Sequence, residues 1–351
     1  MGAGYSILFA QEIMFTSSPE LDLILILTGD IYKEPKIPFP EKINWDNFIR
    51  LASQNKFLCQ VTTKLLEDER LTLEPEVSQR ILQLKKAEDE RYAKMRPTLE
   101  VVNAVLGNEP YLLSKTWRVF PYVTHDVDLL VKDLGRVKEL FEKSGYEVPS
   151  TAHPSSLWIR EKGLLEIEIF LRQIVGPLVF MDDSFLWEKK REMVMEGVKT
   201  HIPSVEADIL TFLADMGFRL YELLVGDMLH LYKVAPQANW ELMAEQAQKH
   251  RWLEQFHNGI AVLNSFHRKL YQEPSPIEKH FSAMAQVKPD LPYVTPLPQV
   301  ARALMKKGWI NLAKLVTYYS VRLKKYPRLH KFYCKVVMGY PENLFLKYIY
   351  H

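Results

Sequence analysis

The chain has 351 residues, of which 47% are hydrophobic and 25% charged, and its formal net charge is +2. This composition is typical of a folded globular protein of two or three domains and excludes an intrinsically disordered chain. The longest apolar stretches, such as LDLILIL at 21–27, are too short to span a bilayer. Because the amino terminus also lacks a basic flank and a small-residue cleavage site, we expect a cytoplasmic protein without a transmembrane segment.

Two cysteines, Cys59 and Cys334, are present, and they do not form a Cys-x-x-Cys pair. Neither a disulfide framework nor a cysteine zinc site is therefore supported.

The first third of the chain repeats apolar residues at helical spacing. From Asn44, a suitable N-cap, to about Glu67 the pattern predicts one or two helices. Residues 74–95 are rich in strong helix formers, and Pro97 should end or kink this helix before a further helical segment. We expect residues 1–108 to form an N-terminal helical domain.

The pattern changes at residue 109. Short apolar runs predict strands, one helix between them is closed by a glycine, and Lys162-Gly163 separates two alternating runs as in a β-hairpin. The runs are YLL at 111–113, THDVDLLV at 124–131, SLWIRE at 156–161 and LLEIEIFL at 164–171, and the helix is DLGRVKELFEKSG at 133–145. We expect a small mixed α/β domain at 109–200.

The helical pattern returns after His201. Pro203-Ser204, followed by acidic residues, is a typical helix start, and helical spacing continues to about residue 286. We expect a C-terminal helical domain at 201–286. Residues 287–351 comprise a proline-rich linker and a basic, aromatic tail. The predicted fold class is therefore α+β, with a small mixed sheet between helical segments.

The tail has a strong excess of basic over acidic residues. Residues 301–351 hold eleven Lys or Arg against the single acid Glu342, and RLKKYPRLHKFYCK at 322–335 interleaves basic and aromatic side chains. Basic residues attract phosphate backbones and aromatic rings stack on bases, which favours RNA as a partner. An amphipathic helix near an anionic membrane is an equally simple interpretation.

Two aspartates interrupt the apolar run of the second predicted strand. Residues two apart on a strand share a face, so Asp126 and Asp128 should point away from the core. Glu166 and Glu168 have the same spacing on another predicted strand. If the two strands are neighbours, three or four carboxylates converge. Such a cluster favours one or two Mg²⁺ ions, which can clamp the oxygens of a phosphoryl or nucleotidyl transfer.

A hydroxyl-bearing turn lies upstream of the aspartates. Ser114, Lys115 and Thr116 occupy it, and Arg118 lies between the turn and the strand. Backbone amides at a helix start bind phosphate, and a lysine adds a positive charge. These four residues are candidate nucleotide-binding residues.

Together these segments resemble the uncharacterised nucleotidyltransferase family of the polymerase-beta-type superfamily. The resemblance extends from about residue 43 to 265, and only HDVDLLV is specific. The segment LLSKTWRVF resembles the family's turn, and LLEIEIFLR resembles its third-carboxylate strand. The segment INWDNFIRLASQNKF resembles its leading helix. IPSVEADILTFL and LLVGDMLHLYKVAPQANWELM resemble trailing helices. The family usually has a glycine in the turn and a histidine after the third acid, and this chain has neither.

The resemblance implies roles for individual residues. Asp126 and Asp128 would be metal ligands, and Glu168 the third carboxylate that activates the attacking hydroxyl, with Glu166 as the competing choice. Ser114, Lys115 and Thr116 would contact the triphosphate. Asp227 matches an acid of the trailing helices, although a polar residue on a helix face is the simpler interpretation.

The expected activity is a Mg²⁺-dependent nucleotidyl transfer. A nucleoside monophosphate would pass from a nucleoside triphosphate (NTP) to a hydroxyl on RNA, protein or a small molecule, with release of pyrophosphate. One alternative is a metal-dependent glycosyltransferase that uses the same Asp-x-Asp pair. Another is a catalytically degenerate RNA-binding or scaffold protein.

Overall fold

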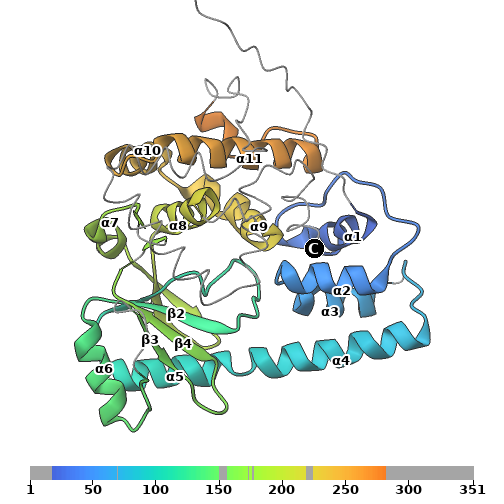
Figure 1. The fold of residues 1–351 in the computed structure, drawn as a ribbon. Coiled ribbons are helices and arrows are strands. Elements are labelled where there is room, and N and C mark those ends of the chain that lie inside the picture. The colour runs from blue at the N-terminus through green and yellow to red at the C-terminus, as the bar shows by residue number, and fades with distance from the viewer. Residues whose placement is uncertain are drawn as a thin grey trace, which may run out of the picture.

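A computed structural model describes residues 18–68, 70–149, 156–172, 174–175, 178–218 and 224–281. Its helices and a small mixed sheet confirm the α+β fold class (Figure 1). The basic tail at 301–351 and Cys334 lie outside the described residues.

The helices fall into three groups along the chain. Those before the sheet are α1 (Pro19–Leu27), α2 (Trp45–Gln54), α3 (Leu58–Glu67), α4 (Pro75–Tyr92) and α5 (Met95–Leu106). Those within the sheet region are α6 (Leu134–Lys143) and α7 (Asp183–Glu188). Those after it are α8 (Val205–Phe218), α9 (Val225–Val234), α10 (Trp240–Lys249) and α11 (Leu253–Tyr271).

The central sheet has four strands in the order β1-β2-β4-β3. They are β1 (Tyr111–Leu113), β2 (Asp126–Val131), β3 (Ser156–Ile159) and β4 (Glu166–Phe170). The central pair β2 and β4 is parallel, and each edge strand is antiparallel to its neighbour. The predicted hairpin is therefore β3–β4, and Gly163 in its turn has a φ of +89°, which suits glycine.

Local sequence signals set several helix ends. The Asn44 side chain accepts a hydrogen bond of 3.0 Å from the Asn47 amide, so the predicted N-cap of α2 is confirmed. Pro97 lies in the first turn of α5, where its missing N–H is not needed, after α4 has ended. The Ser204 hydroxyl accepts from the Ala207 amide at 3.1 Å and caps α8.

The helices that precede and follow the sheet are packed together. In Figure 1, α1 and α2 lie beside α9, although the whole central sheet and α8 lie between them in the sequence. The Lys36 amide donates to the Leu270 carbonyl at 2.7 Å, and the Tyr32 hydroxyl lies 2.9 Å from His267 Nε2. Buried apolar residues form one continuous core from Leu21 to Ile277. The sheet and both helical segments therefore share a core.

Three features were not predicted from the sequence. Helix α1 replaces what was interpreted only as an apolar run, and its N-cap Ser18 accepts from the Leu21 amide. A second hairpin forms from β7 (Arg191–Met195) and β8 (Val198–Ile202), around Gly197 with a φ of +80°. Two short strands, β5 (Ile174–Val175) and β6 (Leu178–Val179), form a further pair.

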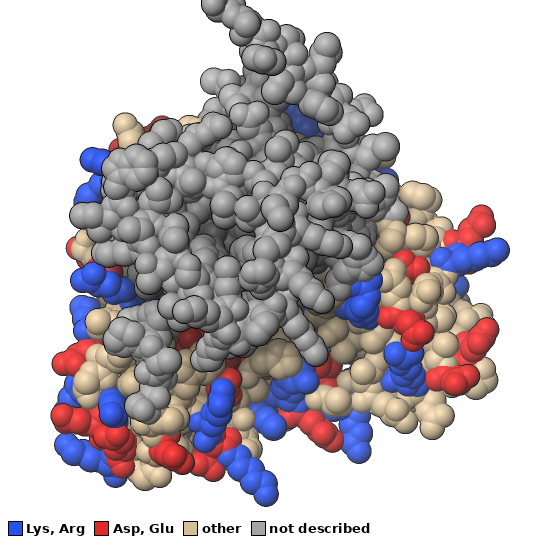
Figure 2. Space-filling model, viewed as in Figure 1, with Lys and Arg blue, Asp and Glu red and all other residues tan. Residues whose placement is uncertain are grey.

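Charged side chains are mixed over the surface. In the view of Figure 2, Lys and Arg alternate with Asp and Glu over the described part of this face. Pairs one helical turn apart contribute to this pattern, such as Lys85 with Asp89 in α4 at 2.6 Å. Among the described residues, no helix combines the length and apolarity needed to cross a membrane.

Candidate functional site

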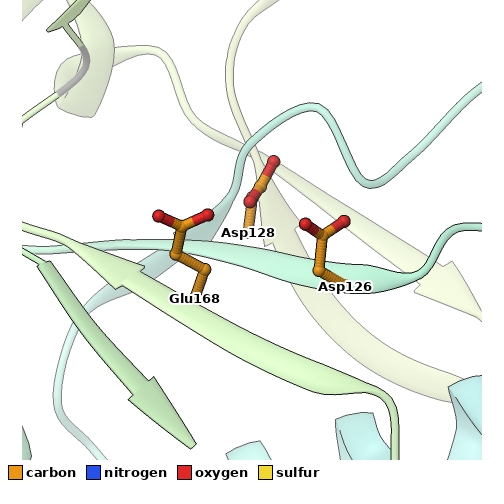
Figure 3. A group of neighbouring side chains, drawn as sticks. All are labelled: Asp126, Asp128 and Glu168. Atoms are coloured by element: carbon orange, nitrogen blue, oxygen red, sulfur yellow. The ribbon is translucent and has the colours of Figure 1, made fainter. Parts of the chain in front are cut away.

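Three carboxylates project from the same side of β2 and β4. The parallel register places Asp128 beside Glu168 and Asp126 beside Glu166. Each of Asp126, Asp128 and Glu168 offers a carboxylate oxygen, and these atoms all lie within 4.8 Å of one another (Figure 3). We call these three residues the acidic triad. The intervening side chains, Val127 and Ile167, are fully buried on the other face of the sheet.

Glu166 does not belong to the triad. Its carboxylate forms an ion pair with the exposed guanidinium of Arg160, near the start of the hairpin turn. Of the two acids that the sequence left as alternatives, the structure therefore brings Glu168 to the aspartates. The parallel register places both acids beside an aspartate, and the ion pair with Arg160 accompanies the absence of Glu166 from the cluster.

The triad forms the floor of a polar cavity of about 340 Å³. Helices α8 and α9 contribute Phe212, Asp215 and Asp227 to the opposite wall, and the turn after α2 contributes Lys56. Concave polar sites of this size are typical of small-ligand binding. Since the walls come from helices before and after the sheet, the packing of both helical segments defines the cavity.

The turn at Ser114–Thr116 differs from the expectation. No helix follows it; residues 114–125 are irregular. The Ser114 amide donates to the Asp128 carbonyl at 2.9 Å, and the Thr116 hydroxyl oxygen accepts from the Asp128 amide at 2.9 Å. Ser114 and Lys115 line the cavity, whereas Thr116 does not. The turn therefore braces β2, and the expected helix-start phosphate site is absent from this described segment.

Lys115 takes the backbone conformation that the missing glycine would favour. Its φ is +59°, in the left-handed region where residues other than Gly, Asn and Asp are uncommon. Its ammonium forms an ion pair with the Asp215 carboxylate of α8. The lysine thus crosses the cavity and ties the turn to the helical wall.

Arg118 is buried. Its guanidinium donates to Asp227 at 2.7 and 3.2 Å and to the Lys115 carbonyl at 2.6 Å. It also lies 4.5 Å from the ring centroids of both Tyr122 and Phe212. Asp227 is a partly exposed residue of α9 that borders the cavity and is the counter-ion of this buried cation. Arg118 borders the cavity, but its described contacts hold the turn against α8 and α9.

A buried histidine–aspartate pair packs against the segment that follows the turn. His230 Nε2 lies 2.8 Å from Asp208 Oδ2, and both side chains are almost fully buried. The Val119 amide donates to His230 Nδ1 at 3.3 Å, and the Trp117 ring packs edge-on against the imidazole. His230 therefore joins α8, α9 and the turn, outside the cavity lining.

The electrostatics of the triad favour a bound cation. Burial and the neighbouring Asp126 carboxylate raise the pKa of Asp128 to about 7, although Lys115 and Lys56 act against this shift. The Thr124 hydroxyl donates to Asp126 at 3.0 Å. Convergent hard oxygen donors are what Mg²⁺ or Mn²⁺ would require, so the residues present fit a divalent ion.

Lys56 is a cavity residue that the sequence interpretation missed. It lies between α2 and α3 with a φ of +61°, and its ammonium is 5.5 Å from the Tyr122 ring centroid. The available signal was a lysine at the junction of two helices, where a glycine or asparagine is usual. His125, adjacent to Asp126, is exposed and does not line the cavity.

No protein-family model, curated protein or solved structure matches this chain. The case for a function therefore depends on the geometry of the cavity and on the chemistry of its side chains.

Proposed function

We propose that this chain is a divalent-metal-dependent nucleotidyltransferase that moves a nucleoside monophosphate from an NTP to a hydroxyl acceptor. The observation that carries the proposal is the acidic triad, in which three carboxylates from two parallel strands meet at the floor of a polar cavity. A pair of aspartates with a third acid on the adjacent strand is also the arrangement that the sequence resemblance implies. Mg²⁺ is the proposed ion.

The triad residues would have different roles in the reaction. Asp126 and Asp128 would hold the ion, and a bound Mg²⁺ would neutralise phosphate charge and align the attacking and leaving oxygens. The Glu168 carboxylate would accept the acceptor's hydroxyl proton as that oxygen attacks the α-phosphorus. The bond from the α-phosphorus to the bridging oxygen then breaks, and pyrophosphate leaves with the electron pair.

The cavity wall would position the substrates. Lys115 and Ser114 border the cavity just after β1, and Phe170, the last residue of β4, and Arg172 border it at the end of that strand. Placement of two reactants in line accounts for much of the catalysis of phosphoryl transfer. The ion pair between buried Arg118 and half-buried Asp227, together with the hydrogen bond from Arg118 to the Lys115 carbonyl, fixes the wall that carries Lys115.

A glycosyltransferase is less well supported. That class would need a nucleotide-binding α/β half ahead of the Asp-x-Asp pair, and the described residues from 18 to 106 form helices and connecting segments without a strand. A degenerate scaffold would not require three carboxylates to face one cavity.

The test is transfer of label from each α-phosphate-labelled NTP, with Mg²⁺, to total RNA and to total protein. Wild-type chain should label at least one acceptor, and the Asp126→Asn/Asp128→Asn variant should not. Glu166→Gln is the matched control, since it removes an acid from the same strand pair outside the triad. Failure of the wild-type chain to label any acceptor, with thermal unfolding unaffected by Mg²⁺ and NTP, would reject the proposal.

A further inference from the structure

The cavity wall contains four cations, and their partners differ. Lys115 pairs with Asp215, Arg118 with Asp227, and Arg172 lies 3.5 Å from Asp183. The fourth is Lys56, and in the described part of the chain its ammonium forms no ion pair with a carboxylate. Lys56 is therefore the cation of the wall that has no direct ion pair among the described residues, although Asp227 and Asp128 lie close enough to interact with its charge.

Lys56 is held firmly in place by its neighbours in sequence. Phe57 is fully buried and packs on Phe120, with ring centroids 5.4 Å apart. The buried Asn55 side chain accepts from the Val225 amide at the start of α9 at 3.0 Å. These anchors fix the α2–α3 junction against α9, while the Lys56 side chain itself is exposed at the cavity.

The backbone at this position would favour a different residue. A φ of +61° is disfavoured for lysine, and glycine would adopt it without steric cost. Backbone strain of this kind gathers at functional sites. The presence of a lysine at this junction, with its side chain at the triad cavity, is better explained by its positive charge than by its backbone preference.

The charge balance of the cavity identifies the ligand group. A divalent ion would only partly neutralise the three triad carboxylates, and the phosphates of an NTP would add further negative charge. Lys115 is engaged with Asp215, and the turn lacks the helix start that would have supplied backbone amides. Desolvation lowers the pKa of Lys56, but Tyr122 and Asp227 raise it above its usual value, so the ammonium remains charged.

We propose that Lys56 binds the phosphate groups of the NTP, so that the N-terminal helices complete the nucleotide site. The inference rests on the proposed function and deepens it, since it assigns the polyphosphate to a side chain from α2–α3 and not to the turn after β1. A charged hydrogen bond from a lysine typically strengthens phosphate binding by about 10- to 100-fold.

The test uses the full chain with Mn²⁺ and compares Lys56→Gly with Arg251→Gly. Arg251 is a matched control, because it is also an exposed cation with a left-handed backbone (φ +59°) and does not line the cavity. Both variants lose one positive charge and relieve the same backbone conformation. Equilibrium affinities are measured for an NTP analogue that cannot be hydrolysed between its α- and β-phosphates, for inorganic triphosphate and for the nucleoside monophosphate.

Lys56→Gly should bind the NTP analogue and inorganic triphosphate about 10- to 100-fold more weakly, while affinity for the monophosphate and for Mn²⁺ changes by about twofold or less. Its thermal midpoint should equal or exceed that of the wild type, which separates lost binding from lost folding. Arg251→Gly should bind like the wild type, and Lys56→Arg should retain most of the affinity.

Two results would overturn the inference in distinguishable ways. Unchanged binding by Lys56→Gly, with tight binding by the wild type, would reject the role of Lys56 and leave the proposed function intact. Absence of NTP and triphosphate binding by the Mn²⁺-loaded wild type would reject both. An equal loss for inorganic triphosphate and the nucleoside monophosphate would also count against the inference, because the two ligands share only a phosphate group and the loss would then reflect a general effect on anion binding, not a contact with the polyphosphate.

Discussion

Asp128 lies directly beside Glu168 in the register of the parallel strands β2 and β4. This pairing brings a carboxylate from the hairpin strand to the Asp-x-Asp strand, and with Asp126 it completes the acidic triad (Figure 3). The register of this strand pair matters, because a shift of one residue would turn the Glu168 side chain to the apolar face of the sheet.

Glu168→Gln and Glu166→Gln should differ strongly. Both change one acid of β4 to its isosteric amide, but only Glu168 belongs to the triad. We expect Glu168→Gln to lower nucleotidyl transfer by about 100-fold or more and Glu166→Gln by about threefold or less. Label transfer at saturating NTP measures this, and similar losses in the two variants would contradict the role of Glu168.

The stability of the metal-free protein should depend on Asp128. Because its pKa is raised to about 7 in the folded chain, the folded state holds a proton that the unfolded state has already lost above the model-peptide value of 3.8. Stability should therefore fall as the pH rises from about 4 to 7, by at most roughly 4 kcal/mol.

Asp128→Asn removes this titration. In the presence of a metal chelator, the variant should be more stable than the wild type above about pH 7 and similar to it near pH 4. Addition of Mn²⁺ at high pH should stabilise the wild type and not the variant. Thermal unfolding across the pH range provides the measurement, and parallel pH profiles for the two proteins would show that Asp128 does not have the raised pKa.

Arg118 should matter for folding more than for phosphate binding. Its buried guanidinium satisfies Asp227 and the Lys115 carbonyl, so Arg118→Met leaves an uncompensated carboxylate. Loss of one partner of a buried ion pair costs about 3–5 kcal/mol. Urea unfolding should show this for Arg118→Met and less for the double variant Arg118→Met/Asp227→Leu, in which both charges are gone. A stable Arg118→Met with weakened NTP binding would instead indicate a direct phosphate contact.

Asn55 should act on nucleotide binding through the position of Lys56. Its buried side chain bridges the Leu51 carbonyl and the Val225 amide, so Asn55→Ala should cost about 1–3 kcal/mol of stability. With the junction loosened, affinity for inorganic triphosphate should fall as well. Asn103→Ala is the matched control, because it loses a 2.8 Å hydrogen bond to the Lys199 carbonyl and Asn103 does not line the cavity. Equal triphosphate affinities in both variants would contradict a positioning role for Asn55.

Local signals predicted much of the secondary structure. Alternation of apolar and acidic residues in β2 and β4 correctly identified the strands and the side on which the acids lie, since side-chain direction has a period of two. The N-cap at Asn44 and the turn at Gly163 were predicted for the same reason, because each depends on one residue and its immediate neighbours. The β7–β8 hairpin was missed, although β8 has a buried alternating face; β7 has no fully buried residue and gives a weak strand pattern.

The sequence by itself determined the strands of the central sheet, their acidic face and several helix ends, because these follow from short-range sterics, hydrogen bonding and hydrophobic periodicity. Tertiary structure alone decided which of Glu166 and Glu168 joins the aspartates, that Arg118 is buried against Asp227, and that Lys56 reaches the cavity. Each of these depends on how segments remote in sequence pack around a shared core. Packing of that kind reflects the burial of apolar surface over the whole chain, which no local pattern records.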